Sequence, residues 1–267
     1  MMSFVNSPGG VSKVRLTHIG TATVLLEIGA LRLLTDPALD PAGNKYSFGF
    51  GTGSTKTSAP VLPPGGLGQL DAVLLTHHQH ADNFDDAGRT VTAEAGAVIT
   101  TRAAARTLPR AIGLAPWQHT ELGAGDLSIR ITATPARHGP PLSRPIVGPV
   151  IGFLLEWAGQ QHGALYISGD TVWFRGVAEV ARRAKIGTAL LHMGGVRFGI
   201  SGPLRYTFDA AEAIRAAQAM TPHTLIPIHY DGWTHFRQPR SDAEQAFAAA
   251  NLSPHWLSPG QPTEIDV

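Results

Sequence analysis

The sequence predicts an α/β protein with two β-rich layers covered by helices. Short apolar strands come first as a run, and predicted strands then alternate with helices, twice over along the 267 residues. Several predicted strands also end in a histidine or an aspartate, which is typical of a site assembled where strand ends face outward. No segment resembles an interdomain linker, so residues 1–267 are expected to form a single domain of two similar halves.

Three short strands are expected near the N-terminus, over residues 14–19, 23–28 and 31–35. Apolar residues alternate along them, and glycines mark the turns between them. The third strand ends at Asp36, because Pro37 cannot continue the pairing of a sheet.

Residues 40–68 are expected to form a long irregular loop, since they are rich in Gly, Pro, Ser and Thr. A loop of this length inside a compact domain is usually functional or disordered. Tyr46, Phe48 and Phe50 argue against disorder. We therefore expect the segment to cover or line a site.

A dense polar cluster follows the apolar run 72–75, which is expected to be a buried strand. It contains His77, His78, His80 and Asp82. So many imidazole and carboxylate groups are costly to crowd together unless a cation binds them. Imidazole nitrogen and carboxylate oxygen are ligands of zinc and related metals, so the cluster indicates a metal site.

Four later strands are predicted to deliver polar residues in the same way. The strands 127–134, 164–168, 188–191 and 224–228 precede, in turn, His138, Asp170, His192 and His229. Other strands are expected at 97–100 and 150–157. Helices are expected from about residue 85, over 102–108, 177–184 and 210–217, and up to residue 249, where Ser241 and Glu244 resemble a capping box.

The composition excludes several classes of function. The net charge is +1 and basic runs are short, so nucleic acid is not expected as a partner. Cysteine is absent, so any metal must be held by histidine and carboxylate. No apolar stretch approaches the roughly 18 residues of a membrane span. The start of the chain, residues 1–10, lacks the features of a signal peptide, which favours a cytoplasmic protein.

Several of these segments together resemble the metallo-β-lactamase-fold hydrolase superfamily. The chain is similar in particular to the branch of ascorbate-6-phosphate lactonase-like and N-acylphosphatidylethanolamine phospholipase D-like proteins. The matching pieces are residues 17–25, 34–37, the histidine cluster, 134–138, 168–171 and 226–230. The resemblance implies a four-layer αββα sandwich of two mixed β-sheets covered by helices. It does not specify a substrate, because this fold hosts many reactions.

The resemblance also implies a ligand set. In the family the cluster reads H-x-H-x-D-H, which places His78 and His80 with His138 on a first metal. Asp82 and His229 would hold a second metal, and Asp170 would bridge the two. His77 is the alternative to His78, since Thr76 and His77 match the pair that often opens the motif.

The departure from the family pattern is Asn83, which stands where the family has histidine. An amide oxygen is a poorer zinc ligand than imidazole, so the second site is weakened, uses a different group, or binds a harder metal such as manganese. We expect one or two Zn²⁺ ions, with Mn²⁺ or Fe as alternatives.

The function implied is that of a metal-dependent hydrolase. A metal-bound hydroxide would attack a small ester, lactone or phosphodiester, with Asp82 orienting the nucleophile or moving a proton. His192 is a candidate catalytic residue that would either contact the substrate or support a metal ligand, and His235 is a weaker candidate of the same kind. Asp36 is expected to hydrogen-bond a ligand imidazole.

The alternative is a metal-binding or regulatory protein that keeps the fold, has a weakened second metal site and catalyses little. In either case the expected partner is a small molecule. Whether the chain forms a homo-oligomer is left open.

Overall fold

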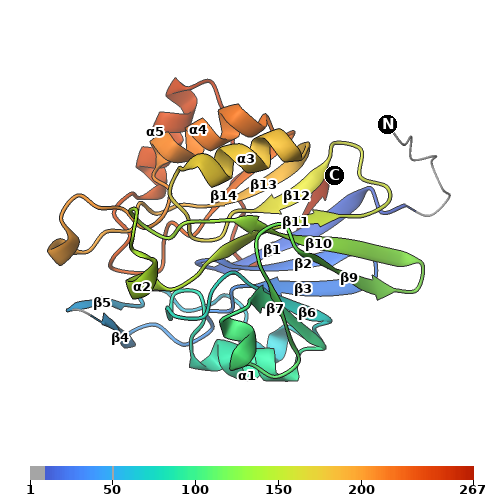
Figure 1. Ribbon diagram of the computed structural model, residues 1–267, viewed down its shortest axis with the longest axis horizontal. Coiled ribbons are helices and arrows are strands. Elements are labelled where there is room, and N and C mark those ends of the chain that lie inside the picture. Colours follow the sequence, from blue (N-terminus) through green and yellow to red (C-terminus); the bar gives the residue numbers. More distant parts are fainter. Residues whose placement is uncertain (1–9, 50) are drawn as a thin grey trace.

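The structure, a computed structural model, describes residues 10–49 and 51–267 (Figure 1). Residues 1–9, on which the signal-peptide expectation largely depends, and Phe50 lie outside this part. Two mixed sheets form the centre. The seven-stranded sheet has the order β15 (Thr263–Asp266), β1 (Lys13–Gly20), β2 (Thr23–Ile28), β3 (Leu31–Thr35), β6 (Ala72–Leu75), β7 (Ala97–Thr101) and β8 (Ala111–Leu114).

The second sheet has six strands and also mixes parallel and antiparallel pairs. Its order is β14 (Thr224–Ile228), β13 (Ile186–His192), β12 (Ala164–Ile167), β11 (Ile151–Glu156), β10 (Leu127–Pro135) and β9 (His119–Ala124). The helices are α1 (Asp86–Glu94), α2 (Arg144–Val147), α3 (Arg175–Arg183), α4 (Ala210–Met220) and α5 (Arg240–Ala249).

Three apolar clusters define four layers. The largest lies between the sheets and joins residues such as Leu26 and Leu33 to Phe153 and Leu165. A second covers the outer face of the six-stranded sheet beneath α3, α4 and α5. A third covers the other sheet beneath α1. Figure 1 shows α3–α5 and α1 on opposite sides of the sheets, so the αββα prediction is confirmed.

The end of the chain returns to its beginning, because β15 pairs antiparallel with β1. The sheet formed mainly by the first half of the chain therefore contains a strand from the second half. In the part of the chain that the structure describes, no helix is long and apolar enough to span a membrane.

The expected irregular loop over residues 40–68 is partly wrong. It contains a hairpin of β4 (Lys45–Gly49) and β5 (Thr52–Thr55), followed by the short 3₁₀ helix η1 (Pro64–Gly66). The hairpin is held by aromatic packing, with the ring centroids of Tyr46 and Trp233 5.1 Å apart. The expectation that the segment lines a site is confirmed, because Phe48 and Thr52 line a cavity described below.

The predicted helix over residues 102–108 is a single 3₁₀ turn, η2 (Ala104–Arg106). The Thr101 hydroxyl accepts a hydrogen bond from the Ala104 N–H, and the chain then turns directly into β8. The short strands β8, β9 and β15 were not expected from the sequence. Strand formation here depends on the neighbouring strand more than on local residue preference.

The predicted capping box at α5 is also wrong. The helix starts at Arg240 with Pro239 as its N-cap, which places Ser241 inside the helix. Glu244 instead accepts a hydrogen bond from the guanidinium of Arg240.

A buried ion pair anchors the segment after the hairpin to the start of α1. Lys56 Nζ lies 3.0 Å from Asp85 Oδ2, and both side chains are almost fully buried. Asp85 also accepts hydrogen bonds from the N–H groups of Leu39, Asp40 and Gly88. This one carboxylate therefore joins three segments and caps the helix.

We predict that Asp85→Ala lowers the free energy of unfolding by about 3–5 kcal/mol, because it leaves the Lys56 ammonium buried without its partner. The exposed neighbour provides the matched control, Asp86→Ala, with an expected change of about 0.5 kcal/mol. Urea denaturation at fixed metal content measures both. Equal changes in the two variants would contradict the role of Asp85.

Candidate metal centre

Six side chains meet in two groups at one end of the sheets. The first group is His77, His80 and His138, and the second is Asp82, Asp170 and His229. In each group the candidate ligand atoms lie within 4.8 Å of one another. They follow the ends of β6 in one sheet and of β10, β12 and β14 in the other. The strand ends of both sheets thus contribute to one site.

The structure places His77, and not His78, in the first group. His77 is fully buried, whereas His78 is partly exposed and lies outside both groups. After His78 the chain forms a turn in which the N–H groups of Asn83 and Phe84 donate hydrogen bonds to the carbonyl of His80. The geometry does not support the preference for His78 drawn from the family pattern, and favours its alternative.

The buried atoms of these groups fit a metal ion. Several of them lack a hydrogen-bond partner in the described structure: His77 Nε2, Asp82 Oδ1, both carboxylate oxygens of Asp170, and His229 Nε2. Buried polar atoms without partners are costly. His77 Nε2 and Asp170 Oδ2, which belong to different groups, are 4.0 Å apart. A nitrogen and oxygen donor set of this kind suits zinc and its neighbours.

Burial sets the protonation state of His77 and His80 in the first group. It lowers the pKa of His77 well below its usual range and, together with the neighbouring His138, lowers that of His80 to about 3. Both imidazoles are therefore neutral at physiological pH, and the neutral form is the one that binds a metal.

The second group behaves differently because it contains two carboxylates. Burial acts to raise the pKa of Asp82, but the nearby His229, whose Nε2 lies 3.6 Å from Asp82 Oδ2, and the hydrogen-bonded His235 outweigh it and leave the pKa well below its usual range. Burial acts to lower the pKa of His229, yet Asp170 and Asp82 raise it to about 9. Without metal, His229 thus carries a proton that an incoming cation would displace.

His235 adds an imidazole that the sequence reasoning ranked low. Its Nε2 lies 2.9 Å from Asp82 Oδ2, and its ring stacks on Phe198 with the centroids 5.4 Å apart. Asn83 is buried but belongs to neither group. An imidazole thus reaches the second group from a distant segment. Its position among Trp233 and Phe236, shortly after His229, was the only sequence signal.

Asp36 supports the first group through an intermediate residue. Its carboxylate accepts hydrogen bonds from the N–H and hydroxyl of Thr76 at 2.8 and 3.0 Å. The Thr76 hydroxyl lies 3.1 Å from His77 Nδ1 and can accept its proton. This series of hydrogen bonds orients His77 so that its Nε2 is available to a metal ion. The expected direct bond from Asp36 to a ligand imidazole is therefore wrong, because Thr76 stands between them.

His192 has a supporting position, which is one of the two roles that the sequence left open for it. It is fully buried, with Nε2 3.2 Å from Asp36 Oδ2 and Nδ1 3.3 Å from the hydroxyl of Ser168. It thus links Asp36 of one sheet to the strand end that carries Asp170. Burial raises the pKa of Asp36 to about 7, although hydrogen bonds from Thr76 oppose this.

Two residues here have unusual backbone conformations. Asp36 and His229 have φ angles of 33° and 60°, which non-glycine residues adopt at a cost. Gly169 precedes Asp170 with φ 61°, and a Cβ there would lie 2.6 Å from the carbonyl of Ile151. The close packing of the strand ends holds these conformations in place.

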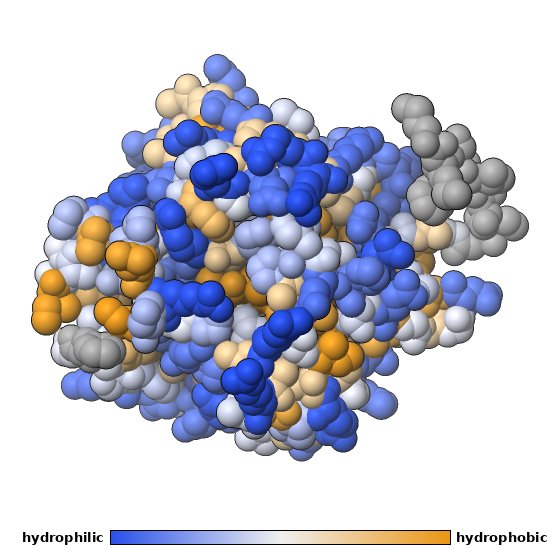
Figure 2. Space-filling view, in the orientation of Figure 1, coloured by the Kyte–Doolittle hydropathy of each residue, from blue (hydrophilic) through white to orange (hydrophobic). Residues whose placement is uncertain are grey.

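A cavity of about 240 Å³ opens beside the two groups. Its polar wall contains His80, Asp82, His138 and His235, while Phe48, Val196 and Phe198 contribute apolar surface. Figure 2 shows hydrophobic side chains gathered at the end of the molecule that carries α2 and the β4–β5 hairpin. Several large apolar residues are exposed in the flanking segments: Leu142, Ile146, Ile200 and Leu204.

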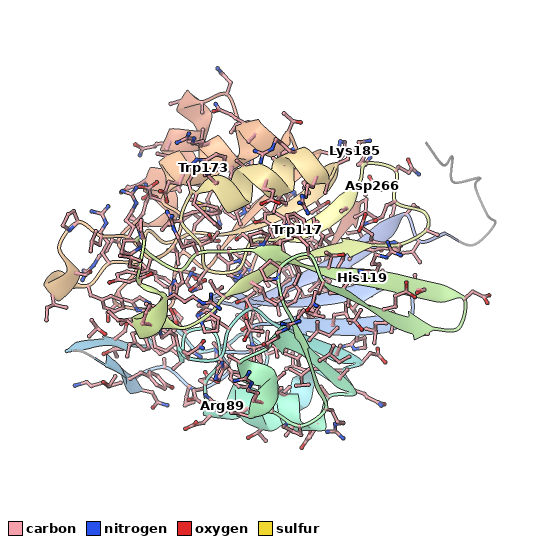
Figure 3. The ribbon with its side chains drawn as sticks, in the orientation of Figure 1. Arg89, Trp117, His119, Trp173, Lys185 and Asp266 are labelled. Atoms are coloured by element: carbon pink, nitrogen blue, oxygen red, sulfur yellow. The ribbon has the colours of Figure 1, made fainter. Side chains whose placement is uncertain are left out.

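Four further histidines, at positions 119, 162, 223 and 255, lie outside the lining of this cavity. His119 is exposed on β9 (Figure 3), and His223 and His255 are also exposed. His162 is partly exposed and stacks on His223, with ring centroids 3.7 Å apart.

The fold and the site define a class: a two-sheet αββα protein with a buried His and Asp centre at one end of the sheets. Within that class, the chain belongs to the family described as the beta-lactamase superfamily domain, whose model matches residues 31–230. The resemblance seen in the sequence is thereby confirmed.

Relatives match over almost their whole length. The chain is 25% identical to a UPF0173 metal-dependent hydrolase of Pelotomaculum thermopropionicum, over 94% of this chain and 100% of the relative. It is 28% identical to one of Methanoregula boonei, over 94% and 98%.

Solved structures show the same fold. An isothiocyanate hydrolase from Delia radicum gut bacteria has a TM-score of 0.79 at 19% identity, with 95% of this chain and 100% of that chain covered. A possible metal-dependent hydrolase of Veillonella parvula has a TM-score of 0.77 at 21% identity, with 95% and 99% covered.

We predict that His77→Ala removes a metal ion from the protein, whereas His78→Ala retains the wild-type metal content, because only His77 faces the buried groups. Elemental analysis of protein purified under identical conditions measures both. A metal loss confined to the His78 variant would contradict this assignment and identify His78 as the ligand, as the family pattern implies.

Proposed function

We propose that this metal-dependent hydrolase of the β-lactamase superfamily cleaves a small ester, lactone or phosphodiester. The observation that carries the proposal is the set of buried, unpartnered His and Asp atoms beside an open cavity. When bound there, a divalent metal lowers the pKa of water to about 7 and polarises a carbonyl or phosphoryl oxygen.

His77, His80 and His138 would hold the first metal, and Asp82 and His229 the second. Asp170 belongs to the second group but faces His77 across 4.0 Å, which supports a bridging role. Zn²⁺ suits this set of nitrogen and oxygen donors, and Mn²⁺ or Fe are the alternatives.

Asp82 is the residue that we assign to the reacting water. It lines the cavity, and its hydrogen-bonded neighbours keep it ionised. An ionised carboxylate in this position can accept a hydrogen bond from water and hold it for attack. His235 positions Asp82, since its Nε2 lies 2.9 Å from the carboxylate.

The size and lining of the cavity also favour a small substrate. A volume of about 240 Å³ is slightly below the roughly 300–1,000 Å³ of typical ligand sites. The aromatic rings of Phe48 and Phe198 would contact an apolar group of the substrate, while the polar wall faces the bond to be cleaved.

The alternative function, a metal-binding or regulatory protein with little catalysis, depended on the weakness of Asn83 as a ligand. The position of His235 weakens the case for this alternative function, because its imidazole reaches the second group in place of a histidine at position 83. A metal content near one ion per chain, with no turnover of any substrate class, would favour this alternative.

We predict that EDTA abolishes hydrolysis of an ester, lactone or phosphodiester and that added Zn²⁺ restores it. Asp82→Asn should lower kcat by about 10²–10⁴-fold, as expected for loss of a group that handles the nucleophile's proton. The control is His119→Gln, an exposed histidine far from the cavity, which should leave kcat unchanged. Full activity of the metal-free protein would contradict the proposal.

A further inference from the structure

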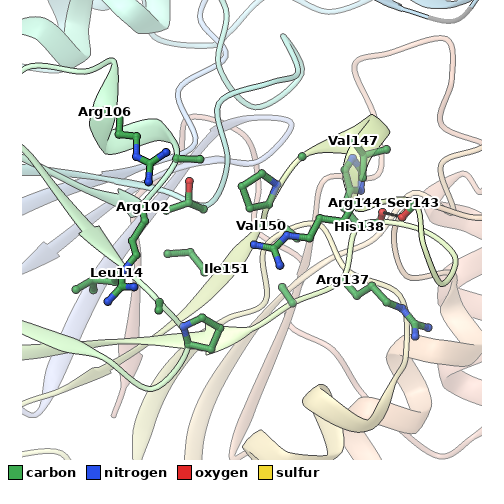
Figure 4. A pocket seen from close by; sticks show the side chains of 17 residues that line it. Arg102, Arg106, Leu114, Arg137, His138, Ser143, Arg144, Val147, Val150 and Ile151 are labelled. Carbon is green, nitrogen blue, oxygen red and sulfur yellow. Dashed lines mark hydrogen bonds between the residues drawn. The ribbon is translucent and has the colours of Figure 1, made fainter.

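A second cavity, of about 400 Å³, lies beside the metal centre (Figure 4). Its walls come from the ends of β7, β8 and β10 and from the segment that joins α2 to β11. His138 and Val147 line both this cavity and the one described above. The two cavities are therefore neighbours separated by these side chains.

The larger cavity is unusually basic. Arg102, Arg106, Arg137 and Arg144 all line it, and among its described lining residues none is acidic. Within the described structure none of the four forms a salt bridge with a carboxylate, although several other arginines do. The protein as a whole has a net charge of only +1, so this concentration of positive charge is local.

Three of these arginines are available to a ligand. Arg106 and Arg144 are exposed, and Arg102 makes one hydrogen bond, to Gln118. In Figure 4 Arg102 and Arg106 come from the segment between β7 and β8, and Arg144 comes from the start of α2. Arg137 is engaged elsewhere, since its guanidinium lies 4.9 Å from the Phe174 ring and donates to the Trp173 carbonyl.

We infer that this cavity binds an oxyanion, either phosphate or carboxylate. A guanidinium offers a planar fork of donors that matches these groups. Three guanidinium groups around one cavity repel each other, and an anion bound between them offsets this repulsion. The shared wall of His138 and Val147 would place the bound anion next to the metal centre.

The oxyanion has two sources. It can be the anionic end of a substrate whose reacting bond lies at the metal centre, or a free anion that binds beside it. The binding itself does not depend on the proposed function, because it can be measured without turnover.

The test is the binding of inorganic phosphate to the metal-loaded protein, measured by isothermal titration calorimetry. Arg106→Gln combined with Arg144→Gln should weaken binding at least about tenfold, since each removes a charge-assisted hydrogen bond. Arg182→Gln provides the matched control, because Arg182 is exposed on α3 outside both cavities, and it should leave the affinity unchanged.

A second measurement separates this cavity from the metals, which also attract phosphate. Binding that survives EDTA and is lost in the double variant supports the inference. Binding that is lost with EDTA but unchanged in the double variant overturns it. Circular dichroism and thermal unfolding check that the variants fold, as expected for exposed side chains.

Kinetics then distinguishes the two sources. If the anion belongs to the substrate, the double variant raises KM for an anionic ester but not for its neutral analogue. If it is free, phosphate alters turnover of the neutral analogue in the wild type and not in the double variant. Either result supports the oxyanion site.

Discussion

The rest of the structure depends on the concentration of imidazole and carboxylate groups at one end of the two sheets. Within the part of the chain that the structure describes, atoms such as His77 Nε2, His229 Nε2 and the oxygens of Asp170 are buried without hydrogen-bond partners. Desolvating such groups is unfavourable unless a cation compensates them. The core between the sheets must therefore be rigid enough to hold them together, and a bound metal would contribute to stability as well as to reactivity.

A layer of buried polar residues behind the ligands provides this rigidity. Asp36 is central to it, because its carboxylate bonds to Thr76 of one sheet and to His192 of the other. The Thr76 hydroxyl orients His77. The Ser168 hydroxyl, close to Asp170, lies within hydrogen-bond distance of His192 Nδ1. The two sheets are thus joined by hydrogen bonds at the point where the ligands leave the strands. His192, which the sequence left open as a substrate contact or a supporting residue, lies in this layer, and such supporting residues are common around metal ligands.

The two cavities differ in chemistry although they share His138 and Val147. The smaller one combines the polar residues of the metal centre with aromatic walls, and the larger one is lined by arginines. A ligand that spans both would have an apolar part and an anionic part on either side of the reacting bond. The β4–β5 hairpin, the helix α2 and the segment between β13 and α4 contribute walls to the smaller cavity.

The sequence by itself determined the class of fold, the central strands and the residue types of the centre. Each apolar strand and the polar residue that follows it (Asp36, His138, Asp170 or His229) can be recognised in the sequence, because the strand and the residue lie within one short stretch. Only the tertiary structure decided between His77 and His78, since the turn after β6 sets which imidazole faces inward. It also brought His235 to Asp82 and added the edge strands β8, β9 and β15 to the sheets. These features depend on contacts between distant segments, and a local pattern of residues does not contain that information.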